Sequence, residues 1–416
     1  MSTPFTPTLP SRRIETLDFL RGFALLGILM VNMPLMNYPI TSILAQTKHY
    51  TGFTDVLAMN FIKVFFESKF YALFSLLFGY GFWLFISRPA GNSTAIPLFR
   101  RRVFLLLLFG LGHVVLLWAG DILVFYALFG FLILWFRKSP DRKLFRWALG
   151  FLLVPVVLNL LMYLLTLLAS LHPEAKAGME NGMAEQAAAL NATIADAIRI
   201  YSSGTYAESV SMRLQEYSMM LPGILFFYPN VLAFFLLGMV AARRRYLQEP
   251  ENHFPLFRSG LKWGLIIGIP GNLLYALAFS QSPPNQASEW SLVVSVCSAF
   301  AAPALTLAYV SGLVLLWQQG KMQEGFRLLA GVGKMALSHY LMQSLITSFL
   351  FLNWGLGLYG KVGVAQGILI TLAIFLTQAG ISRVWLKKFR YGPMEWLWRS
   401  LTYGKIQSLR LQNEGS

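Results

Sequence analysis

The chain has 416 residues, of which 56% are hydrophobic and only 12% are charged, and its formal net charge is +16. Soluble globular domains carry about 25% charged residues, so this composition excludes an ordinary soluble protein. The single cysteine, Cys297, excludes an intrachain disulfide, and no Cys/His cluster indicates a bound metal. The basic residues fall in short blocks between apolar segments, as membrane topology requires, and this argues against a nucleic-acid partner.

Long, continuous apolar segments predict an all-α polytopic membrane protein rather than a β-barrel. Each segment is close to the ~20 residues that a spanning helix needs, and we expect about ten such helices plus interfacial helices. They lie near residues 18–38, 69–88, 103–120, 121–137, 145–170, 219–242, 259–280, 290–317, 334–353 and 363–386. Residues 1–13 are polar and proline-rich, and no secretory signal is expected there. Charges interrupt the helical pattern of 53–68, which predicts an interfacial or re-entrant helix.

The basic residues predict the orientation of these helices. If both termini are cytoplasmic, most of the 34 basic residues lie in cytoplasmic segments, including Arg100–Arg102, Arg243–Arg245 and the tail. This distribution agrees with the positive-inside rule. We therefore expect one transmembrane domain over residues 1–416. It would carry an extracytoplasmic helical insertion at 171–218 and a cytoplasmic interfacial tail at 387–416, which mixes aromatic and basic residues.

The first apolar segment, LDFLRGFALLGILMVNMPLM, contains Asp18, Arg21 and Asn32. Ionisable side chains are costly to bury in lipid, so they face partners or water and often mark a functional site. Asp18 and Arg21 are three residues apart, share a helix face and can form a local ion pair. Alternatively, Arg21 binds an anionic ligand such as a phosphate arriving from the cytoplasm. The predicted topology places Asn32 in the outer half of the membrane.

His113 lies in the third apolar segment, and Asp121 lies in the tight WAGDIL turn that follows. The turn predicts an antiparallel hairpin with both side chains toward the outer face. A histidine oriented by a carboxylate is the usual general-base arrangement. The structural alternative is a histidine that bonds a neighbouring helix and an aspartate that caps the next helix. The cap is the favoured role of Asp121, and a catalytic role is secondary.

Other polar residues are weaker candidates. His49 lies in the loop after the first segment, on the same face as Asn32. Tyr340, Gln343 and Ser344 form a polar stripe on the ninth segment, which is typical of hydrogen bonding between helices. The chain contains no GxxxxGK[ST], HExxH, GxSxG or CxxC motif, so ATP hydrolysis and the corresponding catalytic sites are not expected.

Several motifs together resemble the YeiB-like family of bacterial inner-membrane proteins, which carry a domain of unknown function numbered 418. They are LDFLRGFALLGILMVN, KFYALFSLLFGYGF, the GH…GDIL unit, GKMALSHYLMQS and FRYGPMEWLWRSLTYG. The first segment is also similar to that of acyltransferase family 3 and of the heparan-glucosaminide N-acetyltransferases. That resemblance implies about ten spans around an acyl-CoA channel. Arg21 matches an arginine of the first group, and Asn32 stands where that group has its catalytic histidine.

The resemblance implies an acyltransferase of the bacterial inner membrane that moves an acyl group from cytoplasmic acyl-CoA to an acceptor at the outer face. Arg21, with Asp18, would hold the acyl-CoA phosphates. His113, oriented by Asp121, would be the base, and Asn32 would bond the acyl carbonyl. His49 and Gln343 are further substrate-binding candidates, and the choice between His49 and His113 as the functional histidine stays open.

The same residues are compatible with two other functions. A transporter or flippase for a small metabolite or a lipid-linked group would use the same buried polar residues. A membrane scaffold or sensor would use them only to lock helices together. The expected partners are the lipid bilayer and a small-molecule substrate, with a homodimer also considered; neither a metal nor nucleic acid is expected.

Overall fold

The computed structural model describes residues 14–45, 49–88, 92–283 and 286–411. In these ranges the regular secondary structure is helical, and the only β-type pairing is an isolated bridge between Phe389 and Arg410. The helices are α1 (Glu15–Met36), α2 (Ser42–Ala45), α3 (Phe53–Phe65), α4 (Lys69–Ile86), α5 (Asn92–Leu116), α6 (Leu123–Leu132), α7 (Asp141–Ser170), α8 (Pro173–Ser203), α9 (Tyr206–Met220), α10 (Ile224–Arg243), α11 (Phe254–Gln281), α12 (Glu289–Gln318), α13 (Gln323–Lys334), α14 (Ala336–Phe351), α15 (Val364–Trp385) and α16 (Pro393–Tyr403).

Six helical segments of the described chain are long and apolar enough to cross a bilayer. They are Glu15–Met36, Phe53–Ile86, Asp141–Ser170, Pro250–Gln281, Glu289–Gln318 and Val364–Trp385. A seventh results if Tyr206–Gly223 and Tyr228–Arg243, which are bent by 71° relative to each other, are counted as one span. The coarse expectation of an all-helical membrane protein therefore holds.

Each of the ten predicted segments overlaps a helix, but some of these helices are atypical spans. Helix α5 carries Arg100–Arg102, helix α6 has 10 residues, and helix α14 has 16. The predicted re-entrant segment 53–68 forms α3, and a break at Ser68, whose φ is 69°, separates it from α4. The amphipathic helix α13 was not anticipated, because its short apolar stripe does not resemble a span.

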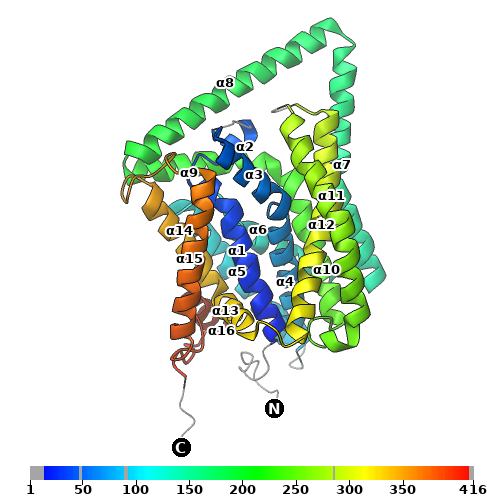
Figure 1. Cartoon of the computed structure of the whole chain (residues 1–416), viewed down its shortest axis with the longest axis vertical. Helices are drawn as coiled ribbons and strands as arrows, with labels where there is room; N and C mark the ends of the chain where they lie inside the picture. Colours follow the sequence, from blue (N-terminus) through cyan, green and yellow to red (C-terminus); the bar gives the residue numbers. More distant parts are fainter. Residues whose placement is uncertain (1–13, 46–48, 89–91, 284–285, 412–416) are drawn as a thin grey trace, which may run out of the picture.

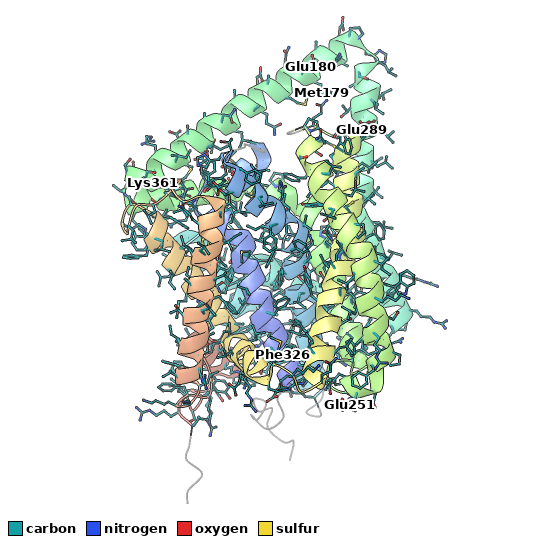
Figure 2. The ribbon with its side chains drawn as sticks, in the orientation of Figure 1. Met179, Glu180, Glu251, Glu289, Phe326 and Lys361 are labelled. Carbon is teal, nitrogen blue, oxygen red and sulfur yellow. The ribbon has the colours of Figure 1, made fainter. Side chains whose placement is uncertain are left out.

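The helices form an elongated bundle with distinguishable ends (Figure 1). The end where α1 begins and where α13 and α16 lie is called the basal end, and the opposite end is called the α8 end. Helix α8 runs obliquely across the α8 end. Figure 2 places Glu251, before α11, at the basal end and Glu289, at the start of α12, at the α8 end, so α11 crosses the full bundle.

Close backbone contact holds α1 against α13 at the basal end. A Cβ atom added at Gly22 would overlap the carbonyl of Leu329, and one added at Gly333 would overlap the carbonyl of Asp18. Small residues let helices approach this closely within a membrane. The contact places the first turns of α1, with Asp18 and Arg21, beside the end of α13.

Candidate functional site

His113 lies at the centre of a buried hydrogen-bonded set that joins three parts of the chain. Its Nδ1 is 2.8 Å from Oδ2 of Asp121, and its Nε2 is 2.8 Å from Oγ of Ser344 on α14. The side chains of His113 and Asp121 are fully buried, and Ser344 is also buried. The structure therefore brings His113 and Asp121 together and adds Ser344, which the sequence indicated only as part of a polar stripe.

The local fold around Asp121 explains how this set forms. The other carboxylate oxygen, Oδ1, accepts a hydrogen bond of 2.7 Å from the backbone N–H of Val124, so Asp121 also caps the start of α6. Gly110 on α5 makes room for this turn, since a Cβ there would lie 2.6 Å from the nitrogen of Val124 and 3.0 Å from Oδ1. Asp121 thus caps α6 and also contacts the imidazole of His113, while its catalytic role stays a prediction.

When the imidazole of His113 is neutral, its two hydrogen bonds determine which ring nitrogen carries the proton. A carboxylate only accepts, so Nδ1 of His113 carries the proton and donates it to Asp121. The free lone pair on Nε2 then accepts from the hydroxyl of Ser344. This leaves a serine hydroxyl hydrogen-bonded to a histidine that a carboxylate orients, which is the arrangement of serine nucleophiles activated by a histidine base.

A cavity of about 420 Å³ opens at the basal end of the bundle. Typical small-molecule sites occupy about 300–1,000 Å³, so the cavity is large enough for a ligand. Its lining extends from Ile14, at the N-cap of α1, to Ile28 within that helix, which is about 20 Å along a helix. Its basic lining residues are Arg21, Arg88, Arg102, Lys334 and Arg399. We call this cavity, with all of its lining residues, the basal cavity.

The basal cavity is charged near its mouth and apolar deeper in the bundle. The apolar part is lined by Leu25, Ile28, Phe74, Phe78, Phe82, Leu106 and Leu123. Its lining also includes Ile122, next to Asp121, and Tyr340, whose ring centroid is 5.0 Å from that of His113. His113, Asp121 and Ser344 are not among the lining residues, so Tyr340 separates the cavity from the hydrogen-bonded set.

A second hollow, of about 20 Å³, lies on the other side of this set. It is lined by Leu117 and Trp118, one turn beyond His113, and by Thr347 and Ser348, one turn beyond Ser344. A volume of this size holds about one water molecule. We call it the α8-end pocket. The His113 set therefore lies between a large cavity and a small pocket that face opposite ends of the bundle.

Helices α8 and α9 close the α8-end pocket. A capping box between Thr205 and Glu208 starts α9 and fixes its direction after α8. The buried Arg213 then donates through Nη1 to the carbonyl of Leu117, at 3.2 Å. Glu216 accepts from the hydroxyl groups of Thr41 and Tyr201 at 3.1 and 2.7 Å. These bonds fasten the predicted insertion directly over the end of α5.

The C-terminal helix α16 closes part of the basal cavity. Oε1 of Glu395 accepts from the backbone N–H groups of Leu337 and Ser338, at 2.6 and 3.1 Å, and Oε2 accepts from the Ser338 hydroxyl at 2.6 Å. Glu395 thus caps the start of α14, and its burial raises the pKa of its carboxyl group. Trp398 donates to the carbonyl of Arg102, whose guanidinium lies 3.7 Å from the Trp398 ring centroid.

Asp18 and Arg21 lie together in the basal cavity. Nη1 of Arg21 is 3.3 Å from Oδ1 of Asp18, and both residues line the cavity. The structure therefore contains the ion pair and leaves Arg21 in contact with the space where an anionic ligand would enter. The role of the pair in ligand binding stays a prediction.

The side chains of the remaining predicted residues make no described hydrogen bond to the His113 set. Asn32 is partly exposed on α1 and lines neither hollow. His49 is exposed, stacks on Tyr38 at a centroid distance of 3.9 Å, and has its Nε2 3.4 Å from the carbonyl of Gly360. Gln343 donates to Gln378 at 2.9 Å and so joins α14 to α15.

Sequence reasoning missed two features of the site. Ser344 was visible only as a stripe residue, and its partner lies 231 residues earlier in the chain. Arg88, Arg102 and Arg399 looked like topology signals, but they converge on the basal cavity with Arg21. Across the described ranges, no group of three or more His, Cys, Asp or Glu side chains is arranged to hold a metal ion.

Comparisons with known proteins establish the family. Residues 241–405 match the family described as "Protein of unknown function (DUF418)". The chain is 37% identical to the uncharacterized protein YxaH of Bacillus subtilis (strain 168), over 95% of this chain and 96% of that protein. It is 29% identical to the uncharacterized protein YeiB of Escherichia coli (strain K12), over 94% of this chain and 96% of that protein. No solved structure matches the chain significantly. The chain belongs to the YeiB-like family of proteins with this domain of unknown function.

Proposed function

We propose that this protein is a membrane acyltransferase that uses cytoplasmic acyl-CoA and delivers the acyl group toward the outer face of a bacterial inner membrane. The observation that carries the proposal is that a large cavity and a buried hydrogen-bonded histidine lie next to each other. A cavity with cationic and apolar parts ends at Tyr340, and the hydrogen-bonded set Asp121–His113–Ser344 lies directly behind that residue.

The basal cavity suits the two chemically different parts of an acyl-CoA. Guanidinium groups bind phosphates through paired, charge-assisted hydrogen bonds, and Arg21, Arg88 and Arg399 supply such groups in the cavity lining. The apolar part beyond them suits a hydrocarbon chain. Bound in this orientation, the donor would point its acyl group toward Tyr340 and the His113 set.

The His113 set suits acyl transfer because the histidine is already oriented. Asp121 keeps the proton on Nδ1, so Nε2 is the basic atom and takes the proton of the attacking group. Asp121 also stabilises the imidazolium that forms. Asn32 lines neither hollow, and the proposal therefore gives it no step.

The proposal includes a topology of about ten spans with both termini in the cytoplasm. The basal end would be cytoplasmic, since α16 lies there and basic residues such as Arg88, Arg102 and Arg399 line the basal cavity. The helices α8 and α9 would then lie outside the cytoplasm, over the α8-end pocket. The shorter helices α6 and α14 would cross the membrane packed against the rest of the bundle, with exposed apolar side chains such as Leu128, Leu345 and Phe349 toward lipid.

Binding of a nonhydrolysable acyl-CoA to the purified protein in lipid nanodiscs tests this proposal. We expect saturable binding that weakens in Arg21→Ala and with rising salt, because phosphate contacts are screened by ions. Arg142→Ala is the matched control, since Arg142 is an exposed arginine of α7 outside the cavity lining. Absence of saturable binding by the wild-type protein would count against the proposal.

A transporter or flippase is the second candidate, and one observation favours it. The two hollows lie on opposite sides of the same buried histidine, as expected for a site that opens alternately to each side of a membrane. Uptake into proteoliposomes that depends on a proton gradient, without release of coenzyme A from an acyl-CoA, would support this function over acyl transfer.

A further inference from the structure

We propose that Ser344 is the nucleophile of this protein and holds the acyl group as a covalent ester between the two half-reactions. The inference rests on the proposed function and adds a step to it. The acyl group would leave the donor in the basal cavity, stay on Ser344, and then pass to an acceptor that arrives from the α8 end.

The first argument is the geometry of the hydrogen-bonded set. Both of its bonds are 2.8 Å long, from Ser344 Oγ to His113 Nε2 and from His113 Nδ1 to Asp121 Oδ2. Serine nucleophiles are recognised by these roles and distances rather than by their order in the chain. Three separate elements, α5, the turn before α6, and α14, supply the three residues.

The second argument is that the described partner of the Ser344 hydroxyl is His113 and not a carbonyl of its own helix. Serine and threonine in the middle of a helix commonly donate to the carbonyl of the preceding turn. Thr306, Thr347 and Ser382 of this protein all do so, at 2.8–2.9 Å. The hydroxyl of Ser344, among the described hydrogen bonds, has Nε2 of His113 as its partner. Its proton is therefore directed at the base and not at the helix backbone.

The proposed step conserves atoms and charge. Ser344 Oγ attacks the thioester carbonyl carbon while its proton moves to Nε2 of His113. The C–S bond then breaks, and the coenzyme A sulfur leaves with that proton as a thiol. In the second half, an acceptor hydroxyl or amine gives its proton to Nε2 and attacks the ester of Ser344. The ester C–O bond breaks, and the proton returns to Ser344 Oγ.

A covalent intermediate fits the position of the set between two separate hollows. Direct transfer would require donor and acceptor to meet at His113 at one moment, with both ends accessible. With the acyl group held on Ser344, each reactant needs access only in its own half-reaction. The ring of Tyr340 lies between the basal cavity and His113, so its displacement would admit the donor from the basal end.

Trapping the acyl-enzyme tests the inference. The full-length protein in nanodiscs is incubated with acetyl-CoA or octanoyl-CoA and no acceptor, quenched in acid, digested and analysed by mass spectrometry. We expect the added acyl mass on the peptide that contains Ser344 and its loss on treatment with hydroxylamine. Ser344→Ala should lose this label and release coenzyme A at least about 100-fold more slowly. Ser344→Cys should regain the label as a thioester.

Ser382→Ala is the matched control. It removes another buried serine that bonds a histidine, His339, at 2.6 Å, and it lies outside both hollows. We expect it to keep the label and to release coenzyme A within about twofold of the wild-type rate. Size-exclusion profiles and thermal melting of all variants show whether each one is folded.

The outcomes separate the two proposals. Acyl transfer by the wild type with unchanged transfer in a folded Ser344→Ala variant would overturn the covalent step and leave the acyltransferase proposal standing. A label on another residue would do the same. Failure of the wild type to bind or cleave either acyl-CoA would overturn both.

Discussion

Two buried histidines of this protein bond serine hydroxyls on other helices, and they differ in what else bonds each pair. The Ser382 hydroxyl donates to the carbonyl of Gln378, whereas the Ser344 hydroxyl, among the described hydrogen bonds, has only the histidine as its partner. His113 bonds Ser344 through Nε2 and Asp121 through Nδ1. His339 bonds Ser382 through Nε2, and its buried Nδ1 has no hydrogen-bond partner within the described residues. A carboxylate therefore orients the first imidazole and stabilises its protonated form, while the second has no such support.

The comparison shows how the same residue pair takes different roles. Without a carboxylate, a proton gained by His339 would be buried with no partner, so its bond to Ser382 serves to join α14 and α15. With Asp121, the imidazolium of His113 is paired as it forms. The two pairs are therefore internal controls for each other, because they share burial and helix α14.

The largest expected effect distinguishes the two histidines directly. Replacing His113 by Gln should lower the rate of acyl transfer by about 10²–10⁴-fold, the usual contribution of a general base. His339→Gln removes the other histidine and should leave the rate within a few-fold of wild type. Release of coenzyme A from acetyl-CoA, followed with a thiol reagent, measures both. Equal losses in the two variants would contradict a special role for His113.

The next effect tests the carboxylate, which only the His113 pair possesses. Asp121→Asn keeps an oxygen that can accept from the Val124 N–H, so the cap of α6 is retained. The amide no longer holds the proton on Nδ1 or stabilises the imidazolium, and we expect a loss of about 10²-fold or more in rate. The same release assay measures this loss, and thermal melting checks that the cap survives. A rate near that of the wild type would reduce Asp121 to a helix cap.

A smaller effect is expected for donor binding. Arg21→Ala should raise the dissociation constant of a nonhydrolysable acyl-CoA by about tenfold, because a charge-assisted hydrogen bond contributes about 1.5–3 kcal/mol and Arg21 is partly exposed. His339→Gln should leave the constant unchanged, which extends the comparison from chemistry to binding. Calorimetry in nanodiscs at low and moderate salt gives the constants. A rise of equal size in Arg142→Ala would indicate a nonspecific charge effect.

The smallest effect concerns the stability of the folded protein and its dependence on the cap of α14, the helix that carries His339. Glu395 caps the start of α14, one turn before His339, and its burial raises the pKa of its carboxyl group above the ordinary value of 4.5. The folded state then binds a proton at Glu395 more readily than the unfolded state does, so the contribution of Glu395 to stability is largest at low pH and falls as pH rises above 4.5. Melting temperatures between pH 4 and 7 should show this fall.

Glu395→Gln sharpens that measurement. The amide oxygen can replace only part of the cap, so we expect a loss of about 1 kcal/mol at low pH. The variant has no carboxyl group at this position and should show a weaker pH dependence than the wild type. An identical pH profile in the two proteins would mean that Glu395 does not titrate in this range.

Much of the site was predictable because its signals are local in the chain. Asp18 and Arg21 are one helix turn apart, and His113 and Asp121 are joined by a tight turn, so short-range geometry brings each pair together. The position of Asn32 relative to His113 depends on how distant helices pack, and the described contacts do not join Asn32 to His113. Ser344 became part of the site only through the packing of α14 against α5.

The apolar segments and basic blocks of the sequence determine that the chain is a helical membrane protein. Apolar segments of this length are stable in lipid, and the charged blocks between them are stable in water. They also identify His113 as unusual, since an ionisable group inside an apolar helix is costly without a partner. Only the packed bundle decided that its second partner is a serine and that five basic residues share one cavity. These contacts join residues from separate helices, and no pattern within one segment encodes which helices will meet.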